Sequence, residues 1–127
     1  MKKFIISIDQ GTTSSRAILF DLKGKPVYSS QKEFTQYFPK SGWVEHNPEE
    51  IWSTTKKTLK DVINKSKKLK GKILTIGITN QRETTVLWDK RTGKAVYNAI
   101  VWQDRRQEEF CKKLRKQNNE TLIFNRT

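Results

Sequence analysis

The sequence predicts an α/β fold in which helices pack on a mixed β-sheet. Short apolar runs rich in Ile, Leu and Val alternate with turn residues, which is typical of strands. A long segment between them carries apolar residues at spacings of three and four, which is typical of a helix that packs on one face. Because strands precede and follow this segment, we expect a sheet with helices packed on it.

Three strands are expected first. Residues 4–9 form a buried strand, residues 11–15 a turn of small residues, and residues 16–20 a second strand. The turn at residues 23–26, which holds a Gly and a Pro, should return the chain into a third strand from Val27. The order predicts an antiparallel meander.

A helix follows an irregular stretch over residues 36–46. Asn47 can cap it, Pro48 suits its first position, and Glu50 completes an arrangement like a capping box. Gly71 is the expected stop. The apolar stripe of this helix consists of Ile51, Thr55, Leu59, Val62 or Ile63, and Leu69.

The last third of the chain predicts three more strands and a helix. Residues 72–79 form a strand, and residues 84–88 and 95–102 form two more, split by a turn over residues 89–93. A second helix should begin at Asp104 and run through Phe110 and Leu114, with Gln107 in its first turn. Alternating apolar residues in the first of these strands are Leu74, Ile76 and Ile78.

Length and charge limit the kind of protein. A chain of 127 residues is one domain at most. The net charge of +13 could attract nucleic acid. However, the densest basic stretch, Lys56 to Lys72, lies on the expected solvent face of the helix, away from the aromatic residues. We therefore favour a solvated basic surface and expect no specific nucleic-acid partner.

Cysteine content and hydropathy predict a cytoplasmic protein. The single cysteine, Cys111, cannot form an internal disulfide, which fits a reducing compartment. The apolar run after Met1 is too short for a secretory signal, and no run approaches the ~20 apolar residues of a membrane span.

The first candidate site is the segment from Asp9 to Arg16. Its Gly11 and four consecutive hydroxyl residues, Thr12 to Ser15, offer backbone and side-chain donors in one turn, which suits phosphate oxygens. Asp9, at the end of a buried strand, could meet Mg²⁺, and Arg16 adds a cation. The alternative is a polar hairpin whose hydroxyls bond only to their own backbone.

Two further candidate sites follow later strands. In the segment from Thr79 to Thr85, Arg82 and Glu83 supply donors and acceptors together, which a polyol requires, although a surface ion pair is the alternative. In the segment from Val101 to Arg106, Trp102 could cover the carbon skeleton of a polyol, or it could be a core tryptophan. His46, the single histidine, lies in no Cys/His/Asp cluster, so we expect it to make a loop hydrogen bond.

These segments resemble the glycerol kinases within the FGGY family of carbohydrate kinases. The resemblance rests on the motif Asp9 to Arg16, the run Gly77 to Thr85, the run Tyr97 to Gln103, and the stretch Ser41 to Trp52. It implies the ribonuclease H-like, actin-like ATPase fold, of which the chain would hold an incomplete half-domain. Residues 1–127 would be the N-terminal part of the family's N-terminal domain, truncated and without the C-terminal domain.

The resemblance also implies roles for individual residues. Thr12, Thr13, Ser14 and Arg16 would contact nucleotide phosphates, and Asp9 would lie near Mg²⁺. Arg82 and Glu83 would bind glycerol hydroxyls, and Trp102 would pack on the glycerol carbons. The catalytic base and the adenine pocket would lie beyond Thr127. The partners implied are glycerol, ATP and the remainder of the kinase chain, with oligomer formation by the longer protein left open.

The function expected from this resemblance is ATP-dependent phosphorylation of glycerol to sn-glycerol 3-phosphate, with the isolated chain inactive. One alternative is a piece of another FGGY sugar kinase, which the pair of Arg82 and Glu83 disfavours. The other is a non-catalytic basic module.

Overall fold

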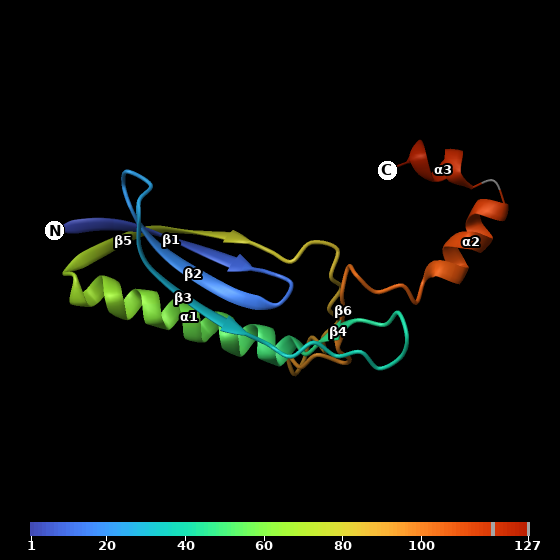
Figure 1. Cartoon of the computed structure of the whole chain (residues 1–127), viewed down its shortest axis with the longest axis horizontal. Helices are drawn as coiled ribbons and strands as arrows, with labels where there is room; N and C mark the ends of the chain where they lie inside the picture. Colours follow the sequence, from blue (N-terminus) through green and yellow to red (C-terminus); the bar gives the residue numbers. More distant parts are fainter. Residues whose placement is uncertain (118, 127) are drawn as a thin grey trace.

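A computed structural model of the chain describes residues 1–117 and 119–126. It contains a four-stranded sheet covered on one face by a long helix, then a two-stranded sheet, then two short helices (Figure 1). The α/β class with a mixed sheet is therefore confirmed.

The first three strands form the expected meander. β1 (Lys2–Gln10) pairs antiparallel with β2 (Ser14–Asp21), and β2 pairs antiparallel with β3 (Pro26–Glu33). β5 (Gly71–Thr79) lies on the other side of β1 and runs parallel to it, so the strand order is β3-β2-β1-β5. A helical connection suits this step, because parallel neighbours need a crossover.

That crossover is α1 (Pro48–Lys68), which packs along one face of the sheet (Figure 1). Asn47 caps it as predicted, since the Glu49 amide donates to the Asn47 side chain over 2.9 Å. The capping-box role predicted for Glu50 is wrong. Its carboxylate instead accepts from the Thr35 amide at 2.8 Å and the Tyr37 hydroxyl at 2.7 Å, which ties the helix to the preceding loop.

Gly71 does not end the helix in the expected way. The left-handed residue after α1 is Lys70, with φ 50°, and Gly71 already begins β5. A Cβ at Gly71 would collide with the ring of Phe4. Glycine is therefore required there by close packing between two strands and not by its backbone conformation.

The core lies between α1 and the strands β1 and β2. Small hydroxyl residues in the buried face of α1, including Thr55, Thr58 and Ser66, let the helix lie close to the sheet. The predicted stripe is confirmed at Thr55 and Val62, and its other members flank them half-buried. The buried apolar cluster consists of Phe4, Ile6, Ile8, Ala17, Leu19 and Val62, with Leu59, Ile63, Leu69 and Ile73 packed against it.

Residues 84–102 differ from prediction. Instead of two full strands, the chain makes an irregular hairpin held by the isolated bridges Thr85↔Ile100 and Trp88↔Ala95. Only β6 (Ala99–Ile100) is a strand, and it pairs with β4 (Glu45–His46) in a second small sheet. The side chains at Leu87 and Trp88 stay exposed, so an extended pair here would have little to pack against.

The second helix also begins later than predicted. α2 (Glu108–Lys116) starts four residues after Asp104, and α3 (Glu120–Phe124) follows it. Asp104 is buried and uses its carboxylate to bind neighbouring segments, so it does not cap the helix. Both helices stand away from the four-stranded sheet (Figure 1). In the described part of the chain, no helix is long and apolar enough to cross a bilayer.

Candidate functional site

The site lies where two parallel strands end. β1 and β5 are neighbours, and Asp9 is opposite Thr79 in their register. The loops that follow the two strands therefore leave the same edge of the sheet side by side. Ligands of open α/β sheets bind at such an edge, outside the carboxyl ends of the strands. The fold thus brings together two of the segments that the sequence singled out.

The loop after β1 is a tight turn that joins β1 to β2. The Gly11 amide donates to the Ser14 carbonyl over 2.9 Å, and the Phe34 amide donates to the Thr13 carbonyl over 3.2 Å. The Thr13 side chain is exposed, whereas the hydroxyl of Ser14 accepts a hydrogen bond from the Gln31 amide at 2.9 Å. We call this loop (residues 11–14) the phosphate loop after the role that the sequence predicts for it; two backbone hydrogen bonds hold its shape.

The fourth hydroxyl of the segment has a different role. Ser15 is fully buried, and its hydroxyl contacts the Thr54 hydroxyl at 2.9 Å and the Thr55 hydroxyl at 3.1 Å. The expectation that four consecutive hydroxyls are displayed together is therefore wrong at Ser15. Strand alternation turns this residue toward α1, where it joins the helix to the sheet.

Asp9 and Arg16 face each other across β1 and β2. They are paired in the antiparallel register, and the Arg16 guanidinium lies 2.6 Å from the Asp9 carboxylate. Both side chains are partly exposed at 32% and 45%, so either can exchange this partner for a ligand. Within residues 1–117 and 119–126, no three His, Cys, Asp or Glu side chains group to hold a metal ion.

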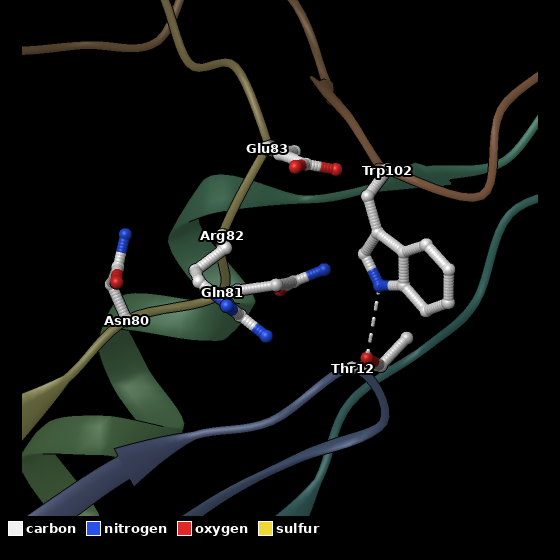
Figure 2. A pocket seen from close by; sticks show the side chains of 6 residues that line it. All are labelled: Thr12, Asn80, Gln81, Arg82, Glu83 and Trp102. Carbon is white, nitrogen blue, oxygen red and sulfur yellow. Dashed lines mark hydrogen bonds between the residues drawn. The ribbon is translucent and has the colours of Figure 1, made fainter.

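A pocket of 420 Å³ opens between the two loops (Figure 2). Its volume lies within the ~300–1,000 Å³ typical of small-molecule sites. Figure 2 shows the Glu83 carboxylate directed toward Trp102 across the pocket. The residues that line it are Thr12, Asn80, Gln81, Arg82, Glu83 and Trp102. The pocket therefore combines the predicted polyol residues with one residue of the phosphate loop.

The charged side chains of the pocket are available for a ligand. Arg82 and Glu83 are both exposed, and neither side chain forms a hydrogen bond or ion pair with another residue that the structure describes. The alternative of a surface ion pair between them is not observed. Glu83 has φ 56°, a left-handed conformation that is uncommon for a residue other than Gly and Asn and that often occurs at functional sites.

Trp102 is a wall of the pocket and not a core residue. Its side chain is 52% exposed, and its indole N–H donates to the Thr12 hydroxyl over 3.2 Å. This bond joins residues 90 positions apart in the sequence. The indole lines the pocket together with Glu83 (Figure 2).

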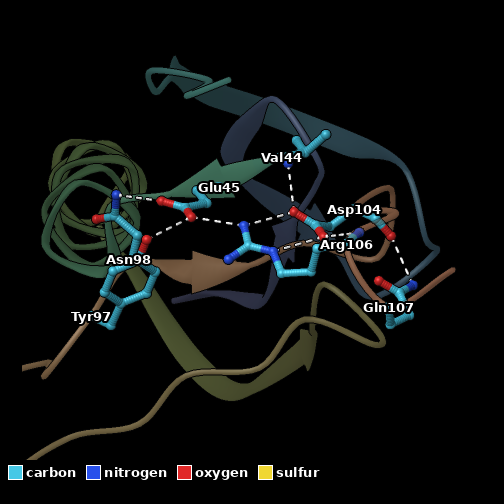
Figure 3. Close-up of polar contacts among 7 residues, drawn as sticks. All are labelled: Val44, Glu45, Tyr97, Asn98, Asp104, Arg106 and Gln107. Carbon is cyan, nitrogen blue, oxygen red and sulfur yellow. Dashed lines mark hydrogen bonds and ion pairs between the residues drawn. The ribbon is translucent and has the colours of Figure 1, made fainter. Parts of the chain in front are cut away.

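A buried ionic network holds the segment that carries Trp102 (Figure 3). Arg106 lies between two buried carboxylates, 2.7 Å from Glu45 and 2.8 Å from Asp104. Asp104 also accepts from the Val44 amide at 2.7 Å, and its own amide donates to the Val101 carbonyl at 2.8 Å. The network therefore closes the turn of residues 101–104 around Trp102 and ties it to β4.

The network keeps both carboxylates ionised. Burial raises the pKa of Glu45, but hydrogen bonds from Arg106, Asn98 and Tyr97 outweigh it, so the pKa lies below its usual value. The pKa of Asp104 is likewise lowered, because Arg106 and the backbone amides outweigh the effect of burial. The Arg106 pKa is raised, chiefly by its bond to Asp104.

Sequence reasoning gave no individual role to several residues of this region. Asn80 and Gln81 line the pocket and belong to the segment predicted as the second site, Thr79 to Thr85, but the prediction gave roles only to the charged pair that follows them. Polar residues directly after a strand were a usable signal for both. Asp104 and Arg106 belong to the third predicted segment, Val101 to Arg106, but their network with Glu45 gave no signal, because residues 45 and 104 come together only when β4 pairs with β6.

Comparisons with known proteins agree on one family. The model of the "FGGY family of carbohydrate kinases, N-terminal domain" matches residues 4–127. The glycerol kinase of Alkaliphilus metalliredigens (strain QYMF) is 58% identical over 127 residues, covering all of this chain and 25% of that protein. The glycerol kinase of Oceanobacillus iheyensis is 57% identical over 126 residues, covering 99% of this chain and 25% of that protein.

Solved structures give the same result. The crystal structure of Plasmodium falciparum glycerol kinase with ADP superposes with a TM-score of 0.81 and 40% identity, covering 89% of this chain and 23% of that one. The xylulose kinase of Rhodospirillum rubrum superposes with a TM-score of 0.81 and 27% identity, covering 89% and 23%. The chain spans about a quarter of the length of the curated relatives that it matches. It belongs to the FGGY family of carbohydrate kinases and matches the N-terminal domain of that family.

Proposed function

We propose that this chain supplies the phosphate loop and the polyol pocket of a glycerol kinase, which transfers the γ-phosphoryl group of ATP to glycerol. The observation that carries the proposal is the shared pocket, in which Thr12 of the phosphate loop lies opposite Arg82 and Glu83. A phosphoryl donor and a polyol acceptor must meet in one place for transfer to occur. The identity of 58% to a glycerol kinase supports glycerol as the polyol.

Each candidate residue has a proposed role in binding. The N–H and hydroxyl groups of Thr12 and Thr13, with the hydroxyl of Ser14 and the cation of Arg16, would bind phosphate oxygens of ATP and of the phosphorylated product. Arg82 would donate to glycerol hydroxyls and Glu83 would accept from them. The Trp102 indole would cover the glycerol carbons, because an aromatic face excludes water from an apolar surface.

The reaction itself is an exchange of two P–O bonds. A terminal hydroxyl oxygen of glycerol bonds to the γ-phosphorus as the bond to the β,γ-bridging oxygen breaks, and the products are sn-glycerol 3-phosphate and ADP. The hydroxyl proton passes to a base that we do not assign to this chain. What these residues contribute is position and charge stabilisation, on which phosphoryl transfer chiefly depends.

Mg²⁺ is the metal that such a transfer uses to neutralise phosphate charge. The residues of the segment from Asp9 to Arg16 offer Mg²⁺ a single carboxylate. Asp9 supplies one carboxylate, already bonded to Arg16, and Mg²⁺ is commonly held by one or two carboxylates with phosphates and water. We therefore propose Asp9 as a contact to the ion or to its water shell. We also propose the cytoplasm as the location, since ATP is supplied there and Cys111 is a free thiol.

A chimera tests the proposal. This chain replaces the matching quarter of the Alkaliphilus glycerol kinase, and ADP release is measured with and without glycerol and Mg²⁺. We expect turnover that depends on both, at a rate close to that of the parent enzyme. The 127-residue chain alone is expected to show none above background, because one side of a catalytic cleft positions neither substrate fully.

A folded chimera without glycerol-dependent turnover would contradict the proposal. The same chimera separates glycerol from the sugars of related kinases. Preference for a sugar such as xylulose over glycerol would favour the alternative of another sugar kinase.

A further inference from the structure

His46 lies between the two halves of the site. It is fully buried in β4, and its ring packs edge-on against Phe34 with the ring centres 5.0 Å apart. Its Nε2 lies 2.6 Å from Oε1 of Gln36, and its Nδ1 lies 3.3 Å from Nε2 of Gln81. Gln81 lines the polyol pocket, so one side of the ring bonds to a pocket residue.

The other side of the ring leads to the phosphate loop. The Gln36 amide donates to the backbone carbonyl of Thr12 at 3.2 Å and to that of Phe34 at 3.3 Å. A carbonyl can only accept, so the NH₂ group of Gln36 must face these two oxygens, and its Oε1 must face His46. A continuous chain of hydrogen bonds therefore runs from Thr12 through Gln36 and His46 to Gln81.

This geometry fixes which nitrogen of the neutral ring carries the hydrogen. Because Gln36 presents an oxygen, Nε2 of His46 must carry the hydrogen and donate it. The neutral ring then has Nδ1 free to accept, so Gln81 presents its NH₂ group to the ring. Burial lowers the pKa of His46, which favours this neutral form.

Gln81 depends on this bond for its orientation. Its Oε1 is buried and has no hydrogen-bond partner among the described residues. The bond to His46 is the one side-chain hydrogen bond of Gln81 within the described part of the chain. Without it, no other described side chain would fix by hydrogen bonding which way the Gln81 amide lies in the wall of the pocket, directly before Arg82 and Glu83.

We propose that His46 is a positioning residue that holds the polyol pocket through Gln81 and the phosphate loop through Gln36, in its neutral, Nε2-protonated form. The proposal deepens the proposed function and rests on it. His46 touches neither substrate; it acts through the two glutamines. This role goes beyond the loop hydrogen bond expected for the single histidine of the sequence.

Three variants of the chimera distinguish the hydrogen bond from His46 to Gln36 from the one between His46 and Gln81. His46→Phe keeps a ring against Phe34 and removes both hydrogen bonds, so the KM values for glycerol and ATP should both rise roughly tenfold, the effect of one hydrogen bond each. His46→Asn keeps an acceptor near Nδ1, and it should raise the KM for ATP more than that for glycerol. His46→Gln keeps a donor near Nε2 and should show the reverse.

The pH dependence of the KM for glycerol tests the hydrogen bonds of His46, because a residue that only packs would not change it. Protonation puts a hydrogen on Nδ1, which can then no longer accept from Gln81. Because burial lowers the pKa of His46, the KM for glycerol should be constant at neutral pH and rise only at pH values below the ordinary histidine pKa of about 6.5. This rise should be absent in all three variants. Around the ring, Gln36, Gln81, Phe34 and Ala99 are uncharged, and Glu50 of α1 is the carboxylate that acts on it.

The control is Phe34→Leu, which loosens the same packing and leaves every hydrogen bond of the chain in place. It should lower the melting temperature without changing either KM or the pH profile. If His46→Phe had the same KM values and the same pH profile as the unsubstituted chimera, the proposal would be overturned and the proposed function would stand. An unsubstituted chimera without activity would instead overturn the proposed function, and this inference with it.

Discussion

At the scale of single residues, the pair formed by Arg82 and Glu83 should decide the substrate. Both side chains face the pocket without a partner among the described residues, so a ligand gains their full charge-assisted hydrogen bonds. Each such bond contributes roughly 1.5–3 kcal/mol. In the chimera, Arg82→Ala or Glu83→Gln should raise the KM for glycerol by roughly 10- to 100-fold and that for ATP much less.

The matched control for Arg82 is Arg91→Ala, which removes an exposed arginine from the distant turn of residues 89–93. Steady-state kinetics with each substrate varied in turn is the measurement. Equal changes in both KM values for Arg82→Ala would indicate a general structural role in place of substrate contact.

Asp9 should act through charge and not through stability. Its ion pair with Arg16 is partly exposed, and such pairs stabilise a fold little. Asp9→Asn in the chimera should therefore leave the melting temperature nearly unchanged. Turnover should fall roughly 10²-fold, the usual effect of removing one charge-stabilising group. If Asp9→Asn kept the turnover of the unsubstituted chimera at every Mg²⁺ concentration, Asp9 would have only a structural role.

The sequence predicted roles for all the pocket residues except the two amides, Asn80 and Gln81. Arg82, Glu83 and Trp102 stood out because charged and aromatic residues after a strand suggest binding, and all three line the pocket. Ser15 was grouped with the phosphate loop because composition alone does not show which way a hydroxyl points. His46 looked isolated because Gln36 and Gln81 are 10 and 35 residues away from it in sequence.

At the scale of elements, the Glu45–Arg106–Asp104 network joins β4 to the turn before α2. Removing one member of a buried ionic network leaves an uncompensated charge, which typically costs about 3–5 kcal/mol. Arg106→Leu should therefore lower the free energy of unfolding by that amount. Arg105→Leu, at the neighbouring exposed position, should change it by less than about 0.5 kcal/mol. Thermal or urea unfolding followed by circular dichroism measures both.

The pH dependence of stability provides a second test of the network. The folded pKa values of Glu45 and Asp104 are lowered, so near pH 4 the folded state binds fewer protons than the unfolded state. Stability from these groups is therefore complete above their unfolded pKa values of about 4 and is lost as the pH falls through the folded values. In Arg106→Leu, Glu45 keeps its bonds from Asn98 and Tyr97 and Asp104 keeps its backbone amides, but both lose the largest contribution that lowers their pKa values. The stability lost on acidification should therefore be smaller in this variant. A variant with the unchanged pH dependence would contradict this account.

Elements were predictable where local signals and packing agreed. The meander and α1 have turn residues, a cap and an apolar face that all favour the same structure. The strands expected at residues 84–88 and 95–102 did not form over most of their length because Leu87, Trp88 and Val96 have no surface to cover. Ala99, which is buried, lies in the short strand β6 that did form. The start of α2 was misplaced because Asp104 resembles a helix cap in sequence, yet its carboxylate binds Val44 and Arg106, at positions that sequence spacing does not reveal.

At the scale of the whole molecule, exposed apolar surface opposes a high net charge. Leu74, Ile76 and Ile78 of β5 are 47%, 44% and 71% exposed, and Phe124 of α3 is 82% exposed. β5 is also an edge strand, which can pair with another chain. The net charge of +13 keeps copies apart at low ionic strength, and salt screens it.

The 127-residue chain should therefore be largely monomeric at low salt and associate as salt rises. Size-exclusion chromatography with light scattering across a salt series measures this. Ile78→Lys, which places a charge on the exposed edge strand, should move the onset of association to higher salt. A compact monomer at every ionic strength would mean that the exposed surface of β5 does not drive association.

The central claim is that glycerol occupies the pocket between the phosphate loop and the loop after β5. The most direct test is a crystal structure of the chimera with glycerol and ADP bound. We expect glycerol hydroxyls within hydrogen-bond distance of Arg82 and Glu83, and the glycerol carbons against the Trp102 indole. Glycerol bound elsewhere, with Arg82, Glu83 and Trp102 facing solvent, would contradict the account.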